Sequence, residues 1–435
     1  METQEIERFR QKLEAFLADL IVKMGRKERQ HWANVYIRGL LLNGERKSIE
    51  PMASRLSDGD VQALQQFVNQ SPWPYGKVRA SLARKVEGEF VPEAYWILDD
   101  VSFPKQGKHS VGVAWQYCGA LGKVADCQVA VTLDLGTEGS STPLNWALYL
   151  PEEWINDPVR RKKSGIPQEV TFKTKPELAL DLIDEVRSWG LKDRLVLADS
   201  AFGDAYEFRQ ALRSRGLDYI VQVEGDLTGW TEDPHPSEAP MKRGGKTPRK
   251  RLYAKDLPPT RSLQQIAKDL PSRSWKKITW REGTKGPLCS RFARVTVWLA
   301  NGLLQGKTME VEPEEMLIEW PDSKEEPWKF WLSSLSPKTS WRKLVRRAKG
   351  RFRIEQDYRE MKMELGLDHF EGRSWQGWHH HVTLVTTAYS FLTLERLGDK
   401  KNFWIDLASC PPVDPEIFTD IYRDMSSLRK TYSHL

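Results

Sequence analysis

Strand-like and helix-like segments alternate through the middle of the chain, and this order restricts the fold more than any other feature. AYWILDD, residues 94–100, is a short apolar run that ends in two carboxylates, and the following segment to Gly136 alternates and breaks at glycine like a meander of strands. Residues 176–189 have helical spacing, and RLVLAD ends a further strand at Asp199. The order predicts an α/β core with a mixed sheet.

Helical patterns flank this core. Apolar positions recur at helical spacing from residue 1 to about residue 85, and again from Trp341 to about Leu397. The two short helices expected around Ser57–Asp60 fit either a groove-reading helix-turn-helix or a plain packing unit. A loop rich in Pro, Gly and charge, residues 231–251, precedes strand-like pieces such as KKITWREG and WKFWLSSL. These pieces predict a β-rich insertion.

The total charge of the chain is nearly balanced, with 66 Lys and Arg against 60 Asp and Glu. A net charge of +6 excludes a histone-like polycation, so a nucleic-acid surface must come from segregated charge. The segment 341–353 holds seven cations and no acid, and the loop 242–251 holds six cations. The acidic stretch 310–326 between them is expected to face solvent or to cover a basic surface.

The chain has no run of 18 apolar residues and no apolar segment behind its N-terminus. We therefore expect no membrane span and no secretory signal, which predicts a cytoplasmic protein. The 18 Trp suit either base stacking or a large core, and six of them concentrate between residues 275 and 331.

Three local contexts single out acidic residues among the 60. Asp99 and Asp100 follow an apolar strand, and Asp199 ends another before a Ser-Ala-Phe-Gly turn that could approach a ligand closely. Glu355 lies in a helical pattern among Arg351, Arg359 and Lys362, which share its face at helical spacing.

The same helix has a buried stripe of its own. Ile354, Tyr358, Met361 and Leu365 recur at helical spacing, and Gly366 is placed to end the helix.

Carboxylates without His or Cys ligands indicate a hard divalent ion such as Mg²⁺, with Mn²⁺ as a substitute. Two such ions could serve in-line displacement at phosphorus. The four cysteines lie far apart without a Cys-x-x-Cys pair, which argues against a zinc site. His379, His380 and His381 would point about 100° apart on a helix, so they are expected to be solvated or to face DNA.

Three ordered blocks carry a family resemblance: residues 96–131, LVLADSAFG, and residues 350–382 from GRFRIEQDYREMKMELGLDHF onward. They resemble bacterial insertion-sequence DDE transposases of the RNase H-like superfamily, most closely the insertion sequence 701 type. The resemblance implies Asp99, Asp199 and Glu355 as the catalytic, metal-binding triad, with Asp100 as an alternative to Asp99.

One signature of the wider family is only partly matched. Arg351, Glu355 and Lys362 fit its Tyr-x2-Arg-x3-Glu-x6-Lys pattern, but Ala348 stands at the Tyr position. Any contact from that Tyr is therefore absent or supplied elsewhere.

The resemblance implies an RNase H-like α/β core interrupted by the insertion. We expect a helical DNA-binding region at residues 1–88 and the first part of the core at 89–225. The β-rich insertion follows at 226–338, and the helical part of the core with the third carboxylate at 339–397. Residues 398–435 form a tail. The cations expected to contact DNA are Lys105, Lys108, Arg346, Arg347, Arg351, Arg359 and Lys362.

The implied function is DNA transposition, a form of DNA recombination, by a nucleoid-associated protein of the bacterial cytoplasm. The protein would bind the terminal inverted repeats of a mobile element as a homodimer on double-stranded DNA, cleave the ends and join 3′-hydroxyls to target DNA. Two alternatives remain: a metal-dependent nuclease of the same fold without strand transfer, and a catalytically inactive DNA-binding regulator.

Overall fold

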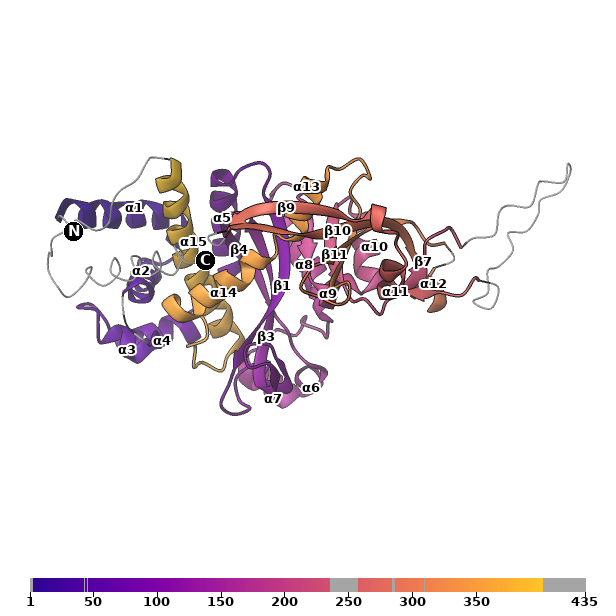
Figure 1. Ribbon diagram of the computed structural model, residues 1–435. Helices are drawn as coiled ribbons and strands as arrows, with labels where there is room; N and C mark the ends of the chain where they lie inside the picture. Colours follow the sequence, from indigo (N-terminus) through magenta and orange to yellow (C-terminus); the bar gives the residue numbers. More distant parts are fainter. Residues whose placement is uncertain are drawn as a thin grey trace, which may run out of the picture. The chain divides into compact units, whose positions relative to one another are not determined.

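The computed structural model of the chain describes residues 3–401, except 43, 45, 235–256, 284–285 and 309. The chain divides into two compact units, which can be followed by colour in Figure 1. The first unit comprises Met1–Asp193 and the chain from Phe352 onward, and the second comprises Arg194–Arg351.

The first unit begins with the helices that the sequence predicts. Their bounds are α1 Thr3–Ile21, η1 Val22–Met24, α2 Lys27–Leu41, α3 Ile49–Ala53, α4 Val61–Asn69 and α5 Tyr75–Glu89. Asp60 caps α4 by accepting a hydrogen bond from the Ala63 backbone N–H at 2.9 Å, as expected for the turn at Ser57–Asp60. The apolar face of α1 is buried, and its Phe9 and Phe16 rings pack against Phe391 of the C-terminal helix α15, Trp375–Lys401.

The predicted meander of strands is confirmed in the first unit. Its strands are β1 Tyr95–Pro104, β2 Ala114–Cys118, β3 Lys123–Gly136 and β4 Ser141–Leu148. Strand β3 pairs antiparallel with each of the other three. The expectation that the first strand ends at Asp99 and Asp100 is wrong. Because Val101 and Phe103 continue the buried apolar pattern, β1 extends to Pro104, and Asp99 lies in its middle.

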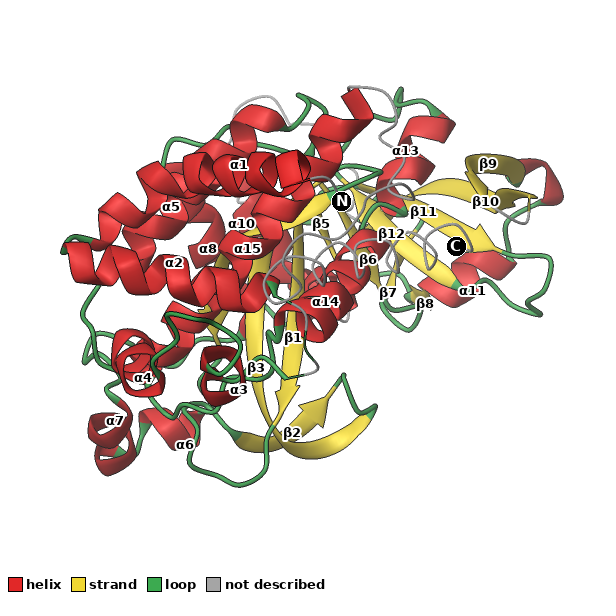
Figure 2. Ribbon diagram, turned by 90° about the vertical axis from the view of Figure 1, so that its left-hand side faces the viewer, coloured by secondary structure: helices red, strands yellow, loops and turns green. Residues whose placement is uncertain are grey.

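Helices cover both faces of this sheet. Thr132 of β3 and Trp146 of β4 hydrogen-bond to Tyr358 of α14, Phe352–Leu365, and to Thr386 of α15. Asn145, the neighbour of Trp146 and thus on the opposite face, donates to Glu185 of α8, Lys175–Ser188. Figures 1 and 2 show α14 beside β1. Two shorter helices, α6 Glu152–Ile155 and α7 Pro158–Ser164, connect β4 to α8.

The second unit contains a mixed sheet in the order β5-β6-β12-β11-β10-β7-β8, with β9 paired to β10. Only β5 and β6 run parallel among the pairs described in this unit. The strands are β5 Val196–Ala198, β6 Tyr219–Val223, β7 Thr228–Trp230, β8 Arg261–Ser262, β9 Lys276–Gly283, β10 Gly286–Leu299, β11 Glu314–Trp320 and β12 Lys329–Ser333. The helices are α9 Ser200–Gly203, α10 Tyr206–Ser214, α11 Leu263–Lys268, η3 Ser272–Ser274, α12 Asn301–Leu304 and α13 Trp341–Ala348.

The basic segment 341–353 is not one helix. Helix α13 ends at Ala348, a turn follows, and α14 begins at Phe352. Arg351 therefore lies in the turn, and only Glu355, Arg359 and Lys362 of the predicted basic face belong to α14. The buried stripe of α14 is confirmed, and Gly366 ends the helix with a φ of +62° in the left-handed region that favours glycine.

The three consecutive histidines are buried, so the expectation that they face solvent or DNA is wrong. His379, His380 and His381 lie on α15 at 4 %, 0 % and 1 % exposure. The His380 ring stacks on Trp73, and the His381 Nδ1 contacts the Tyr36 hydroxyl at 2.9 Å. Burial lowers the pKa of His380 to about 4. The histidines instead join α15 to the N-terminal helices.

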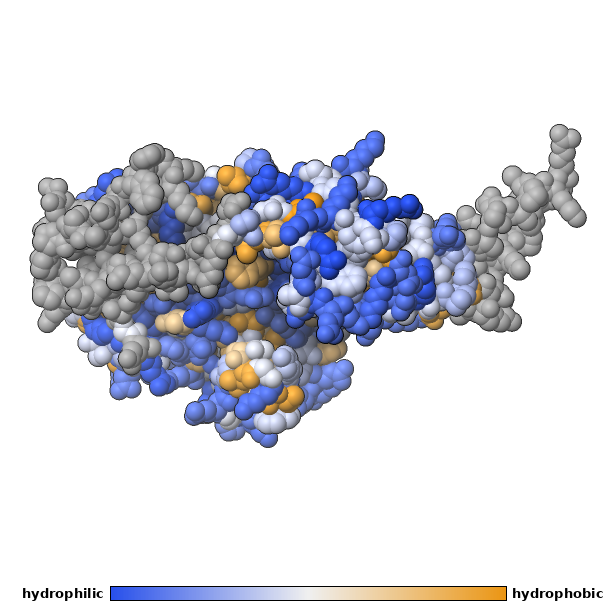
Figure 3. Space-filling model, viewed as in Figure 1, coloured by the Kyte–Doolittle hydropathy of each residue, from blue (hydrophilic) through white to orange (hydrophobic). Residues whose placement is uncertain are grey.

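The expected basic loop 242–251 and the expected tail beyond residue 401 fall outside the described residues. Among the residues that are described, no helix is both long and apolar enough to cross a membrane. On the face drawn in Figure 3, apolar side chains show as separate small areas among polar ones.

Candidate active site

Asp99 and Asp100 point to opposite faces of the first unit's sheet, since side chains alternate along a strand. Asp99 is 5 % exposed and lies opposite Thr132 in the β1–β3 register. Thr132 bonds to Tyr358, so Asp99 shares the face that α14 covers. The Asp100 carboxylate instead forms an ion pair with Lys175 of α8. The two candidates for the first carboxylate thus have different surroundings.

Glu355 lies on α14, the helix that covers the face of Asp99. Glu355 is exposed and lies one turn before Tyr358, which is buried against this face. Burial raises the pKa of Tyr358 well above its usual value, and the nearby carboxylates of Asp134 and Asp99 raise it further. The first unit therefore contains two of the three predicted carboxylates, one on the strand and one on the helix above it.

Lys362, one further turn along α14, reaches back to β1. Its Nζ donates a hydrogen bond to the Ser102 carbonyl at 2.8 Å and lies 5.4 Å from the Phe103 ring centroid. Burial lowers the pKa of this lysine. Lys362 thus anchors α14 to the strand that carries Asp99.

Two further acids in this region were missed from the sequence. Asp134 of β3 is fully buried, and burial raises its pKa well above the usual value, with Asp357 and Asp99 as further causes. Burial also raises the pKa of Asp357 of α14 to about 7, although Ser141 and Tyr389 donate hydrogen bonds to its carboxylate. An available signal for Asp134 was its position inside the apolar run VAVTLDL.

Asp199 belongs to the second unit, where β5 ends directly before it, as predicted. Its Oδ1 accepts a hydrogen bond from the Ala201 backbone N–H at 3.1 Å and caps α9. The Ser-Ala-Phe-Gly segment forms this one-turn helix. A Cβ at Gly203 would lie 2.0 Å from the Gln222 carbonyl oxygen of β6. Gly203 therefore lets α9 approach the neighbouring strand β6 closely.

The predicted DNA-contacting cations have unequal surroundings. In the first unit, Lys108 and Arg359 are exposed, whereas Lys105 is half-buried and donates to the Phe370 carbonyl at 2.8 Å. Burial lowers the pKa of Lys105 to about 8. In the second unit, Arg346 donates to the Trp280 carbonyl at 2.9 Å. Arg347 and Arg351 are half-buried in the same unit.

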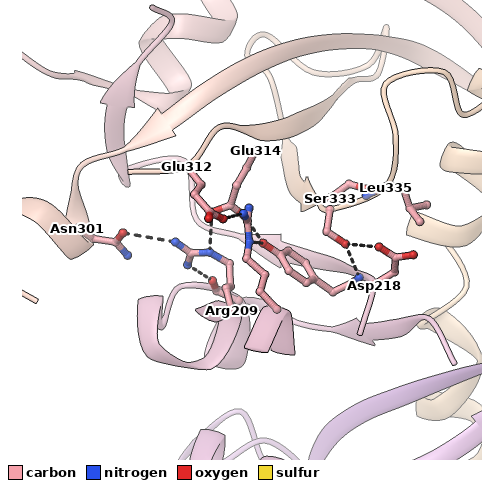
Figure 4. A network of polar contacts seen from close by, with 11 residues as sticks. Arg209, Asp218, Asn301, Glu312, Glu314, Ser333 and Leu335 are labelled. Carbon is pink, nitrogen blue, oxygen red and sulfur yellow. Dashed lines mark hydrogen bonds and ion pairs between the residues drawn. The ribbon is translucent and has the colours of Figure 1, made fainter. Parts of the chain in front are cut away.

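The acidic stretch 310–326 does not face solvent throughout, contrary to expectation. Glu314 is 5 % exposed and accepts hydrogen bonds from Arg209 Nε at 3.2 Å and from the Tyr219 hydroxyl at 2.8 Å, as the network in Figure 4 shows. Glu319 is buried and paired with Lys349. Glu315 is largely buried and paired with Arg294, whereas Glu312 and Asp322 are exposed.

The donor set of the candidate site suits a hard divalent ion, because Asp99, Asp199 and Glu355 offer only carboxylate oxygens. Across the parts of the chain that the structure describes, no three His, Cys, Asp or Glu side chains are gathered tightly enough to hold a metal. Asp99 and Glu355 belong to one unit and Asp199 to the other.

Comparison with known proteins identifies the family. Residues 19–287 match a family described as DDE superfamily endonuclease. The chain belongs to this family. The matched range includes Asp99 and Asp199 and ends before Glu355. DDE endonucleases use divalent metal, which agrees with the carboxylate donor set.

Two individual proteins are similar to this DDE endonuclease. A probable transposase for insertion sequence element IS701 from Microchaete diplosiphon is 31 % identical over 193 residues. That match covers 43 % of this chain and 47 % of the relative, so the chain spans about half the length of the curated relative. A piggyBac transposase, solved as a synaptic complex with hairpin DNA, matches with a TM-score of 0.43 and 11 % identity over 94 % of this chain and 73 % of that one.

Proposed function

We propose that this DDE endonuclease is a DNA transposase that binds terminal inverted repeats, cleaves the transposon ends and joins their 3′-hydroxyls to target DNA. The observation that carries the proposal is the placement of Asp99 on β1 beneath α14, the helix of Glu355, in a chain of the DDE family. The basic residues expected to contact DNA also support the proposal.

Asp99, Asp199 and Glu355 would hold divalent metal, Mg²⁺ with Mn²⁺ as a substitute. When bound, two such ions activate the attacking oxygen and stabilise the leaving oxygen of an in-line displacement at phosphorus. The ion pair of Asp100 with Lys175 on the opposite sheet face favours Asp99 over Asp100 in this role.

The chain's own residues would position the DNA strand. Arg359, one turn beyond Glu355 on α14, is exposed and can neutralise a phosphate, as can Lys108. Lys362 and Lys105, which donate to backbone carbonyls, would hold the elements that frame the site and bring their charge close to phosphates. Arg346, Arg347 and Arg351 would add contacts from the second unit.

The domain scheme remains part of the proposal. Residues 1–88 would help to recognise the inverted repeats, 89–225 and 339–397 would form the RNase H-like core, 226–338 would form the insertion, and 398–435 the tail. Two copies would act together, because transposition must pair two DNA ends.

The test uses the full chain with a labelled duplex that carries the inverted repeat of its own element. Wild type should cut in Mg²⁺, stop cutting in excess EDTA and recover when Mg²⁺ is restored. Glu355→Gln and Asp99→Asn should lose cleavage by at least a hundredfold while retaining DNA binding. Asp100→Asn, the matched control on the opposite face, should retain most cleavage.

A second arm separates the alternatives. A pre-cut end with a free 3′-hydroxyl is supplied with a plasmid, and joined product is measured. Cleavage without any joined product would show a nuclease rather than a transposase. If wild type binds DNA without cutting it, and the Glu355→Gln variant behaves in the same way, the protein is an inactive regulator.

A further inference from the structure

An exposed aromatic surface lies on the hairpin of β2 and β3. Trp115 and Tyr117 of β2 are 71 % and 64 % exposed. Leu121 in the turn and Val124 at the start of β3 are also exposed. Contiguous exposed apolar side chains of this size mark a binding surface more often than isolated ones do. We call these four residues the hairpin surface.

The hairpin surface lies on the same face of the sheet as Asp99. Tyr117 pairs with Val124, and Asp99 pairs with Thr132 on the same strand β3. Val124 and Thr132 are an even number of residues apart, so their side chains, and those of their partners, share one face. The eight-residue separation corresponds to about 26 Å along the strand. The hairpin bends back toward β1, as Figure 2 shows, and the Ala120 backbone N–H in its turn donates to the Ser102 hydroxyl at 2.9 Å.

Exposed cations lie on the hairpin and on the segments joined to it. Lys123 begins β3 beside Val124, on the opposite face of the strand, and Lys108 lies in the loop before β2. Helix α7 adds the exposed Lys162 and Lys163. Its position beside this loop is fixed by Arg160, which donates to the Lys108 carbonyl at 3.2 Å. The preceding helix is fixed by the Trp154 indole, which donates to the Val113 carbonyl at 2.8 Å.

Aromatic faces bordered by lysines are the pattern by which proteins hold unpaired nucleic-acid strands. Trp115 and Tyr117 are two residues apart on a strand, a spacing of about 6.6 Å. Because stacked bases repeat at about 3.4 Å, this spacing leaves room for one base between two rings. A second copy of the chain fits less well, since four apolar residues fall far short of the roughly 800 Å² that each partner buries in a stable interface.

We propose that the hairpin surface binds a DNA strand with unpaired bases, with Trp115 and Tyr117 stacking on the bases and the exposed lysines of the hairpin and of the segments joined to it contacting phosphates. This inference rests on the proposed function. It extends the DNA path from the Asp99 face of the sheet to the hairpin.

The first test measures binding by fluorescence anisotropy, with every variant built in the full-length Glu355→Gln background. The probes are a blunt duplex and the same duplex with a single-stranded tail of about 16 nucleotides, the upper range for one binding module. Trp115→Ala/Tyr117→Ala should weaken binding to the tailed duplex about tenfold or more and leave the blunt duplex within twofold. Trp115→Phe/Tyr117→Phe keeps both rings and should bind like the parent. Leu304→Ala, an exposed apolar residue of the second unit, is the matched control and should change nothing.

The second test locates the contact. A tail containing 5-bromodeoxyuridine is photo-crosslinked, and the protein is digested with trypsin. The crosslink should fall in the peptide between Lys108 and Lys123, which contains both aromatic residues. A crosslink only to other peptides, together with unchanged affinity of the alanine variant, overturns the inference.

The results separate a failure of the hairpin inference from a failure of the proposed function. If wild type cleaves DNA while the alanine variant binds the tailed duplex like its parent, the hairpin inference fails and the proposed function stands. If wild type binds no DNA of either form, both fail. If the alanine substitutions instead convert a DNA-free dimer to a monomer in light scattering, the surface binds a second copy and the DNA assignment is wrong.

Discussion

At the scale of single residues, buried acids distinguish this protein from an ordinary α/β core. Asp134 and Asp357 lie between the sheet and α14, where burial raises both pKa values. An acid whose pKa is raised on folding holds a proton that the unfolded chain has released. Folding stability therefore falls as pH rises from the unfolded value near 4 toward the folded pKa.

Asp134→Asn should remove part of this pH dependence. The amide resembles a protonated acid in size and cannot ionise, so the variant should gain stability relative to wild type as pH rises above about 4. Urea unfolding at several pH values should show a less negative slope, by up to about 1.4 kcal/mol per pH unit. Glu93→Gln, an exposed acid before β1, serves as the control. Parallel curves for Asp134→Asn and wild type would show that Asp134 is ionised when folded.

At the scale of elements, Gly203 lets the short helix α9 approach β6. Gly203→Ala would place a Cβ 2.0 Å from the Gln222 carbonyl and force α9, which Asp199 caps, away from the strand. We expect a loss of about 1–3 kcal/mol in unfolding free energy and a fall in cleavage. Gly88→Ala in α5 meets no atom within 4 Å and should be neutral or stabilising by up to about 1 kcal/mol. Equal melting temperatures for the two variants would refute the close packing.

The second unit also contains a buried ion pair between Arg209 and Glu314. Both side chains are almost fully buried, at 1 % and 5 % exposure. Arg209→Ala would leave the buried Glu314 with the more distant Arg213, at 3.9 Å, and the Tyr219 hydroxyl, and should destabilise the protein by about 3–5 kcal/mol. Arg261→Ala breaks the exposed pair with Asp269 and should cost less than about 1 kcal/mol. Calorimetric melting of both variants tests the contrast, and similar shifts would contradict it.

At the scale of the whole chain, distant segments complete one unit. The N-terminal helices pack on α15, and the buried Arg79 of α5 donates to Thr383 of α15 and to Asn145 of β4. A fragment of residues 1–92 would expose apolar residues such as Phe9 that α15 covers. We expect this fragment to show no cooperative unfolding transition by circular dichroism. A sharp transition at the melting temperature of the full chain would show that it folds independently.

Much of this architecture follows from local sequence. The period of apolar residues predicted α1, α8, α14 and the meander of β1–β4, because one buried face imposes a period of 3.6 or 2 on the residues that form it. The strand end at Asp199 and the helix end at Gly366 were equally local. The turn that separates α13 from α14 was not predicted, since the cations on both sides suit a helix and the break occurs at Lys349-Gly350-Arg351.

The α/β class, the family and the three candidate carboxylates could be predicted from the sequence, since these depend on residue types at short range. The face that each side chain occupies became clear only from the folded chain. The tertiary structure placed Asp99 under α14 and Asp100 against Lys175, buried His379–His381 and Glu314, and left Trp115 and Tyr117 exposed. Burial depends on which distant element covers a residue, and polar and aromatic side chains are stable in either environment once their contacts are satisfied.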